Sequence, residues 1–230
     1  MKRLYTYLFA ILLLAAVTAL PSHAQYLSTK YASSKKYMVG VRGGLNFSNY
    51  LGKNFSNGNR KMRGLAGVYL KYNVAPQFAI QPEVNMSWMG AKFNAQSFAY
   101  FNDHNAAGNV NILETHLQIP VLAKYQIRTQ SGIEPNIFAG PVASFPIYDK
   151  YKYSAASNST ASVPGKGKLK DINLNQRSSQ FGMQFGAGLQ FSGLSLDARY
   201  YLGLTHAFKN SVNEKILRNN AIMVTLGIGI

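Results

Sequence analysis

Residues 179–204 read SQFGMQFGAGLQFSGLSLDARYYLGL, and this stretch decides the fold of the chain. From Phe181 to Phe191, and again from Leu194 to Leu204, apolar residues alternate with small or polar ones. A period of two places each set on its own face of a β-strand. Ser192-Gly193 between the halves is typical of a two-residue hairpin turn. Each arm has about the 9–11 residues that a membrane-crossing strand needs, so the stretch predicts one hairpin of a transmembrane β-barrel.

The same alternation recurs along the chain, near residues 39–47, 62–72, 77–89, 112–127, 136–148 and 219–230. With the hairpin this makes eight strands, and the connections between them are alternately long and short. The long ones lie near residues 49–61, 91–111, 149–177 and 205–218. Outer-membrane barrels combine short periplasmic turns, long outer loops and an even strand number. We therefore predict an all-β fold, an eight-stranded antiparallel up-and-down transmembrane β-barrel with short periplasmic turns and long extracellular loops.

One detail of the third strand is also predictable. Pro82 lies inside it and cannot donate a backbone hydrogen bond to a neighbouring strand. Proline within a sheet is found at edges and at bulges. The sequence therefore predicts a β-bulge at Pro82.

The chain begins with a segment that is not part of the barrel. Lys2 and Arg3 precede an apolar run over residues 8–20, and Ser22-His23-Ala24 forms a small-x-small cleavage site. This order is typical of a secretory signal peptide, and the apolar run is too short for a spanning helix. The predicted organisation is a signal peptide over residues 1–24, a polar periplasmic leader over residues 25–36 and an outer-membrane β-barrel domain over residues 37–230.

Composition narrows the classes of function. The chain has 230 residues and a mean hydropathy of −0.09, which excludes a bundle of membrane helices. It has no cysteine, which excludes disulfides and thiolate metal sites. Without Lys2 and Arg3, 22 of the 24 basic residues remain against 8 acidic ones, a formal charge of +14. Export argues against nucleic acid as the partner, so the basic residues are expected to meet anionic lipid head groups or surface glycans.

Several short motifs add a resemblance to this reading. They are GGLN at 43–46, QPEV at 81–84, LQIPVLAKY at 117–125, AGP at 139–141, LDARY at 196–200, LGL at 202–204 and RN at 218–219. In this order they span essentially the whole mature chain, which resembles the PorT-like outer-membrane β-barrel family of Bacteroidetes, often labelled porin family proteins. The resemblance implies a Gram-negative outer-membrane barrel that contacts outer-membrane lipid and the barrel assembly machinery, and we expect a monomer. It implies no reaction.

Charged residues collect on the face predicted to point inward. They are Arg42, Lys71, Glu83, Glu114, His116, Lys124, Asp197 and Arg199. An eight-stranded barrel is just wide enough for side chains to fill it, and charges there must pair or be hydrated. We therefore predict an internal ion-pair network in which Glu83, Glu114 and Asp197 oppose the arginines and lysines. The alternative is a narrow conduction path or a proton relay.

The sequence offers little that points to catalysis. Glu114 and His116 share one face of a strand and could form a general-base pair, but no serine or threonine is fixed beside them, so a hydrogen-bonded interior pair is the preferred interpretation. No HExxH or comparable metal-ligand spacing occurs. The glycines of residues 40–44 do not form a phosphate-binding loop and are expected to leave room inside the barrel. We predict no catalytic residue, metal or cofactor.

Two surface features suit a membrane barrel. Aromatic residues near strand ends are expected to form interfacial girdles, namely Tyr37, Tyr72, Phe78, Trp88, Tyr125, Phe145, Tyr148, Phe191 and Tyr200. Basic residues of two long loops are expected to form an outer rim that can contact lipopolysaccharide phosphates, namely Lys53, Arg60, Lys61, Lys150, Lys152, Lys166, Lys168, Lys170 and Arg177. The alternative for these basic residues is a solvated, disordered loop.

Three functions follow from these observations. The first is a non-enzymatic outer-membrane barrel with a structural, surface-interaction or narrow-channel role. The second is a secreted, soluble, lipocalin-like barrel that holds an apolar ligand, which would need an apolar interior. The third is a membrane-embedded hydrolase that modifies lipid, which would need a nucleophile and a base at one height of the barrel wall.

Overall fold

The computed structural model describes residues 36–51, 59–95, 101, 107–127, 129, 132–156, 164–172, 174–209 and 217–230. The predicted signal peptide, and the predicted leader except for Lys36, lie outside these residues. The strands all belong to one compact unit that runs from Ser34 to Ile230. No helix in the described part of the chain is long and apolar enough to cross a membrane.

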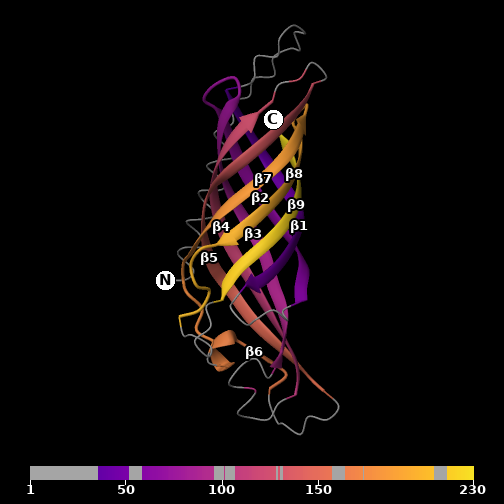
Figure 1. Ribbon diagram of the computed structural model, residues 1–230, viewed down its shortest axis with the longest axis vertical. Coiled ribbons are helices and arrows are strands. Elements are labelled where there is room, and N and C mark those ends of the chain that lie inside the picture. The colour runs from indigo at the N-terminus through magenta and orange to yellow at the C-terminus, as the bar shows by residue number, and fades with distance from the viewer. Residues whose placement is uncertain are drawn as a thin grey trace. The chain divides into compact units, whose positions relative to one another are not determined.

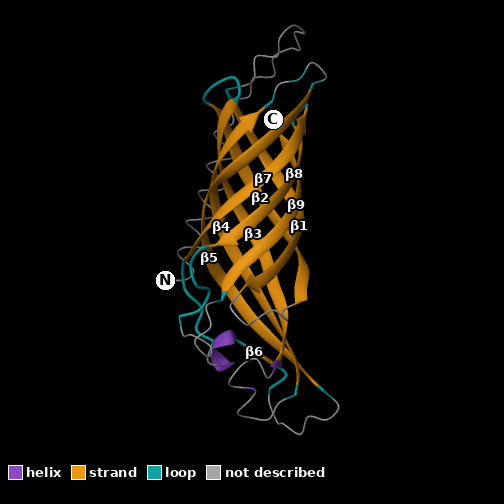
Figure 2. Ribbon diagram, in the orientation of Figure 1, coloured by secondary structure: helices purple, strands orange, loops and turns teal. Residues whose placement is uncertain are grey.

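Eight strands form a closed ring (Figure 1). They are β1 (Tyr37–Leu51), β2 (Asn59–Asn73), β3 (Phe78–Asn94), β4 (Gly108–Gln126), β5 (Ile133–Ala155), β7 (Gln180–Phe191), β8 (Leu194–Gly203) and β9 (Arg218–Gly229). Each pairs antiparallel with its neighbour along the chain, and β1 pairs with β9 to close the ring. The two-residue strand β6 (Lys166–Gly167) is added to β5 outside the ring, and a short 3-10 helix, η2 (Leu169–Ile172), follows it. The predicted fold class is therefore confirmed (Figure 2).

The two ends of the barrel differ. At one end, which we call the turn end, residues 74–77, 127–132 and 192–193 connect strands. Ser192 and Gly193 have φ values of 44° and 87°, as expected for the type I′ turn that matches strand twist. The chain end lies there too, because Val39 and Ile230 exchange backbone hydrogen bonds of 3.1 and 2.9 Å. The opposite ends of the strands, together with β6 and η2, form the other end of the barrel, which we call the loop end (Figure 1).

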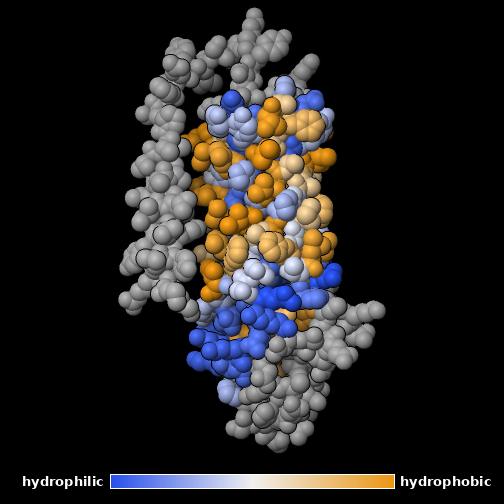
Figure 3. All heavy atoms as spheres, turned by 90° about the vertical axis from the view of Figure 1, so that its left-hand side faces the viewer, coloured by the Kyte–Doolittle hydropathy of each residue, from blue (hydrophilic) through white to orange (hydrophobic). Residues whose placement is uncertain are grey.

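Apolar side chains face outward over the middle of the barrel, as Figure 3 shows for one side. Leu226 and Ile228 are 66% and 59% exposed, whereas Thr225 and Gly227 between and beside them are buried. The same alternation holds on the other strands of the ring. Among the predicted girdle residues, Tyr37 packs on Tyr72 and Phe78 on Tyr125 at the turn end, with ring centroids 5.2 and 5.1 Å apart. This outward apolar face is the reverse of what a lipocalin-like carrier needs.

Inward-facing glycines make room for large rings inside the barrel, as the sequence predicts. A Cβ atom added to Gly40 would clash with the Tyr69 ring and with the Ile228 carbonyl. A Cβ atom at Gly186 would likewise clash with the Phe138 ring. Each aromatic side chain thus packs against the backbone of a glycine on a neighbouring strand. This packing fills the lumen without widening the barrel.

Several predicted boundaries were wrong at the loop end. β3 continues to Asn94, β4 begins at Gly108 and β5 continues to Ala155, so residues 149–155 are strand and not loop. The reason is that their inward side chains are apolar and buried, including Phe93, Tyr151 and Tyr153, while the outward ones are polar and gave the stretch a loop-like composition.

The bulge predicted at Pro82 was also wrong. The register between β2 and β3 is the same before and after this residue, as Tyr69↔Glu83 and Tyr72↔Ile80 show. The shifts lie between Arg60 and Leu65 and between Thr115 and His116. Pro82 can give up a ladder bond without an extra residue, so the strand keeps its register.

Candidate functional site

Four charged side chains meet near the middle of the lumen. Arg42 Nη1 lies 3.1 Å from Glu83 Oε1 and 3.5 Å from Asp197 Oδ2. Arg199 Nη1 lies 2.9 Å from Glu83 Oε2, and Arg199 Nη2 lies 2.6 Å from Asp197 Oδ2. These residues come from β1, β3 and β8, and the inward curvature of the ring brings them together. We call Arg42, Glu83, Asp197 and Arg199 the ion-pair network.

Neutral groups add further contacts to the network. Gln81 Nε2 and Asn85 Nδ2 donate to the two oxygens of Glu83 at 2.6 and 2.8 Å. The Arg42 guanidinium lies 4.6 Å from the centre of the Tyr69 ring. All four charged side chains of the network are at most 1% exposed. Buried ions are tolerated when they are paired and hydrogen-bonded. Each of these four groups is paired, while Arg42 Nε, Arg199 Nε and Asp197 Oδ1 have no hydrogen-bond partner among the described residues.

The two predicted interior lysines lie outside these ion pairs. Lys71 Nζ donates to Gln126 Oε1 at 3.2 Å and to Gln190 Oε1 at 2.9 Å, near the turn end. Lys124 Nζ lies 5.0 Å from the centre of the Phe138 ring. Within the described residues, no carboxylate lies at ion-pair distance from Lys124.

Glu114 does not oppose an arginine or a lysine, in contrast to the prediction. Its Oε2 lies 2.7 Å from Nε2 of His116, and Nδ1 of the same ring lies 2.9 Å from Ser144 Oγ. Sequence reasoning missed Ser144, because the register shift between Thr115 and His116 decides which β5 residue meets the imidazole. The side chains form a carboxylate–imidazole–hydroxyl relay, and the exposed fraction of each residue is 2% or less.

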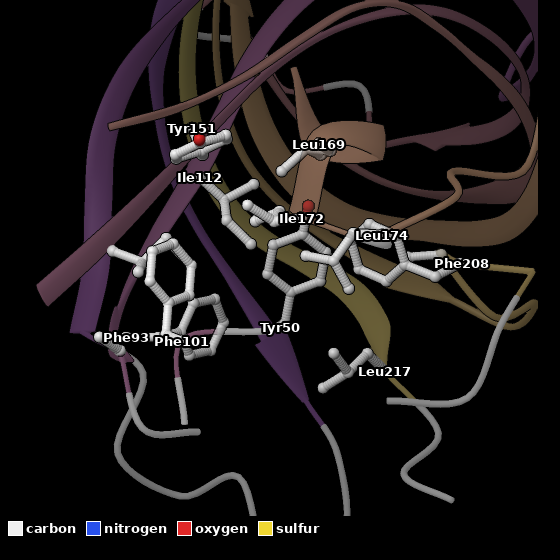
Figure 4. Packing of buried hydrophobic residues seen from close by; sticks show 14 of the residues in the cluster. Tyr50, Phe93, Phe101, Ile112, Tyr151, Leu169, Ile172, Leu174, Phe208 and Leu217 are labelled. Atoms are coloured by element: carbon white, nitrogen blue, oxygen red, sulfur yellow. The ribbon is translucent and has the colours of Figure 1, made fainter. Parts of the chain in front are cut away.

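Apolar layers enclose this relay on both sides. Along β5, Ser144 follows Val142 and precedes Tyr151. Val142 belongs to a middle cluster with Leu65, Met89, Tyr201, Ala221 and Met223. Tyr151 belongs to the loop-end cluster (Figure 4), which consists of Tyr50, Ala91, Phe93, Ala95, Phe101, Val110, Ile112, Tyr151, Tyr153, Leu169, Ile172, Leu174, Ala207, Phe208 and Leu217. Residues of η2 and of the segments before β7 and β9 thus close over the lumen at the loop end.

The predicted basic rim is divided between strands and loops. Lys53 lies outside the described residues. Arg60 and Lys61 lie at the start of β2, Lys150 and Lys152 on the outward face of β5, and Lys166 on β6. Lys168, Lys170 and Arg177 are exposed near η2. Within the described residues, no group of three or more histidines and carboxylates could hold a metal ion.

A known protein family matches most of the chain. Residues 23–209 match the model of a family described as outer membrane protein beta-barrel domain. No curated protein matches the chain. Similar solved structures include Ail, the attachment invasion locus protein of Yersinia pestis, in complex with the heparin analogue sucrose octasulfate, at 12% identity and a TM-score of 0.40 over 85% of this chain and 99% of Ail.

Two further solved structures are similar. Neisserial surface protein A matches at 11% identity and a TM-score of 0.41 over 84% of this chain and 96% of its own. The outer membrane enzyme PagL matches at 11% identity and a TM-score of 0.42 over 83% of this chain and 99% of its own. The ring of eight antiparallel strands, its outward apolar face and the family match together show that this chain is an outer-membrane protein and belongs to the outer membrane protein beta-barrel domain family.

Proposed function

We propose that this protein is a non-conducting, non-enzymatic outer-membrane barrel with a structural and surface-interaction role. The observation that carries the proposal is the filling of the lumen. The ion-pair network lies near its middle, and the loop-end cluster closes over it toward the outside. A barrel of eight strands has room for little besides side chains, so ions and solutes have no evident route.

The loop end supports the surface-interaction part of the proposal. Strands β3, β4 and β5 extend past the outward apolar band, and η2 packs on their inward side through Leu169 and Ile172. A stable apolar core at this end presents a folded surface to the outside of the cell. We propose a monomer, since the strands of the ring leave no open edge for pairing with a second barrel.

Ion conductance tests the proposal directly. The mature chain would be reconstituted into planar lipid bilayers, with an open porin as the positive control, and current would be recorded at several voltages. We expect no single-channel steps from this protein. Steady unitary currents whose size changes in a Glu83→Gln variant would refute it, and would assign conduction to the path through the ion-pair network.

A hydrolase is the second candidate, and the Ser144–His116–Glu114 relay favours it. A hydroxyl beside an imidazole that is oriented by a carboxylate is the arrangement that activates a nucleophilic serine. Burial opposes the assignment, because apolar layers lie on both sides and Ser144 is 1% exposed. In the first proposal the relay satisfies buried polar groups and carries out no reaction.

Labelling separates the two candidates. The folded barrel would be treated with a fluorophosphonate probe and assayed with lipid A as substrate, alongside Ser144→Ala and His116→Gln variants. We expect no labelling and no release of acyl chains. Labelling that disappears in the Ser144→Ala variant, together with release of fatty acid, would establish the hydrolase and refute the non-enzymatic proposal.

A further inference from the structure

A row of basic side chains crosses the outward face of the sheet at the loop end. The strand registers place Lys166 of β6 opposite Lys152 of β5, Lys152 opposite Asn111 of β4, and Asn111 opposite Lys92 of β3. The inward neighbours of the β3, β4 and β5 members belong to the loop-end cluster, so the row itself faces outward. We call Lys166, Lys152, Asn111 and Lys92 the lysine row.

The lysine row is not neutralised within the described residues. Lys152 and Lys166 are exposed and directly opposite each other, a placement of like charges that is unfavourable in a sheet. The described carboxylates nearby are engaged with backbone. Asp149 Oδ2 accepts from Leu169 N at 2.8 Å, and Asp171 Oδ2 accepts from Lys168 N at 2.9 Å. None of the ion pairs among described residues includes a lysine of the row.

The height of the row relative to the membrane follows from register. Trp88, Thr115 and Tyr148 lie opposite one another on β3, β4 and β5, with Trp88 and Tyr148 exposed at the edge of the apolar band. The lysine row lies four residues further along each of these strands toward the loop end. At about 3.3 Å per residue and the usual tilt of barrel strands, this is about 10 Å above the aromatic residues, at the level of lipid head groups. Figure 3 shows a hydrophilic zone next to the apolar band at this end.

We propose that the lysine row binds the phosphate groups of lipid A in the outer leaflet. Lysine ammonium groups attract phosphate as point charges, and an anionic membrane surface attracts lysine side chains that lie within a Debye length of it. A phosphorylated glycolipid satisfies both parts of this surface at once. Its acyl chains lie on the apolar face below Trp88 and Tyr148, and its phosphates then reach the row above. A soluble polyanion would use the lysines alone.

The test measures lipid binding by native mass spectrometry on the mature barrel in detergent. The ligands are bisphosphorylated lipid A, chemically dephosphorylated lipid A and a soluble heparin fragment. The test variant is Lys152→Gln with Lys166→Gln. The matched control is Lys209→Gln with Arg218→Gln, which removes two exposed charges at the same end of the barrel but outside the row. Because all four side chains are exposed, each variant should keep the boiling-dependent mobility shift of a folded barrel.

We expect the test variant to bind bisphosphorylated lipid A about tenfold or more weakly than the unmodified protein, since each cation near an anionic surface contributes severalfold. The control should change binding less than about twofold, and the unmodified protein should bind the dephosphorylated lipid as weakly as the test variant binds the phosphorylated one. Equal losses in the two variants, or equal binding of both lipids, would overturn the proposal. Tight binding of the heparin fragment without lipid A binding would also overturn it and assign the row to a soluble polyanion. This test measures lipid binding and not ion conductance, so a negative result would leave the proposed non-conducting role unaffected.

Discussion

Arg42 and Glu83 meet inside the ring with 3.1 Å between Nη1 and Oε1, although the whole width of β2 separates their strands. The contact is possible only because the sheet is closed and strongly curved, so that inward side chains of next-nearest strands converge. The stability of the barrel therefore depends on charged groups that lie inside the lumen, away from the membrane-facing surface.

Replacing Glu83 by Gln should therefore destabilise the barrel strongly. The variant leaves Arg42 and Arg199 with one carboxylate between them, and removing one partner of a buried ion pair costs about 3–5 kcal/mol. The temperature at which the folded band is lost on a gel, or the midpoint of urea unfolding in detergent, should fall clearly. Glu134→Gln is the control, because Glu134 is half-buried near the turn end and takes part in no ion pair within the described residues. A Glu83→Gln variant as stable as this control would contradict a stabilising role for the network.

Replacing Lys124 by Met should stabilise the barrel or leave its stability unchanged. The ion-pair network already balances two guanidinium groups with two carboxylates, and Lys124 adds a further buried cation beside it. Its Nζ lies over the Phe138 ring and makes no ion pair among the described residues, although Asp197 and Glu83 attract it at longer range. Apolar replacement of a buried charge with similar volume is often neutral or stabilising by about 1–4 kcal/mol. The same unfolding assay reports the result. A loss of about 3 kcal/mol or more, the cost of breaking a buried ion pair, would mean that Lys124 contributes essential attraction to the network.

Alanine substitutions at two glycines of β1 should show that an added methyl group is costly inside the lumen and tolerated on the membrane face. At Gly40 the added methyl would clash with the Tyr69 ring and the Ile228 carbonyl, and such overpacking costs about 1–3 kcal/mol. At Gly43, three residues along the same strand, a Cβ atom would meet its nearest neighbour, Leu65 O, at 3.8 Å, which is an ordinary contact. We expect Gly40→Ala to lower the unfolding midpoint and Gly43→Ala to leave it nearly unchanged. Equal decreases in the unfolding midpoint would show that sheet propensity, and not the space in the lumen, determines the loss of stability.

Truncating Leu169 should loosen the loop end without opening the barrel. This side chain is fully buried in the loop-end cluster and holds η2 against it (Figure 4). Leu→Ala changes in such sites cost about 2–5 kcal/mol. Because η2 belongs to a segment outside the ring, that cost should appear as faster tryptic cleavage at Lys166, Lys168 and Lys170, with an unchanged mobility shift on boiling. Val74→Ala, an exposed position at the turn end, is the control. Unchanged cleavage in the Leu169→Ala variant would contradict the role of the cluster as a cap.

Much of the fold was readable from the sequence because a β-barrel wall has a strict local code. The alternation in Ser179–Leu204 assigned each residue of that hairpin to the membrane or to the lumen, and the structure has the same assignment. The alternating long and short connections gave the strand count and the two ends. These features depend only on the period of two and on chain length, so no long-range contact is needed to predict them.

The loop end was harder to read. Tyr151 and Tyr153 lie in a stretch rich in lysine and serine, and only packing against Phe101 and η2 shows that they belong to a strand with a buried face. Composition averages over both faces of a strand, so an outward polar face can conceal an inward apolar one.

The sequence by itself determined which charges lie inside the barrel, and only the tertiary structure decided how they pair. Arg42, Glu83, Asp197 and Arg199 join in one network, whereas Glu114 turns to His116 and, through it, to Ser144. The choice of partner depends on strand register and on the curvature of the closed ring. A shift of one residue at Thr115 and His116 changes which β5 side chain meets the imidazole, and no local pattern in the sequence specifies that shift.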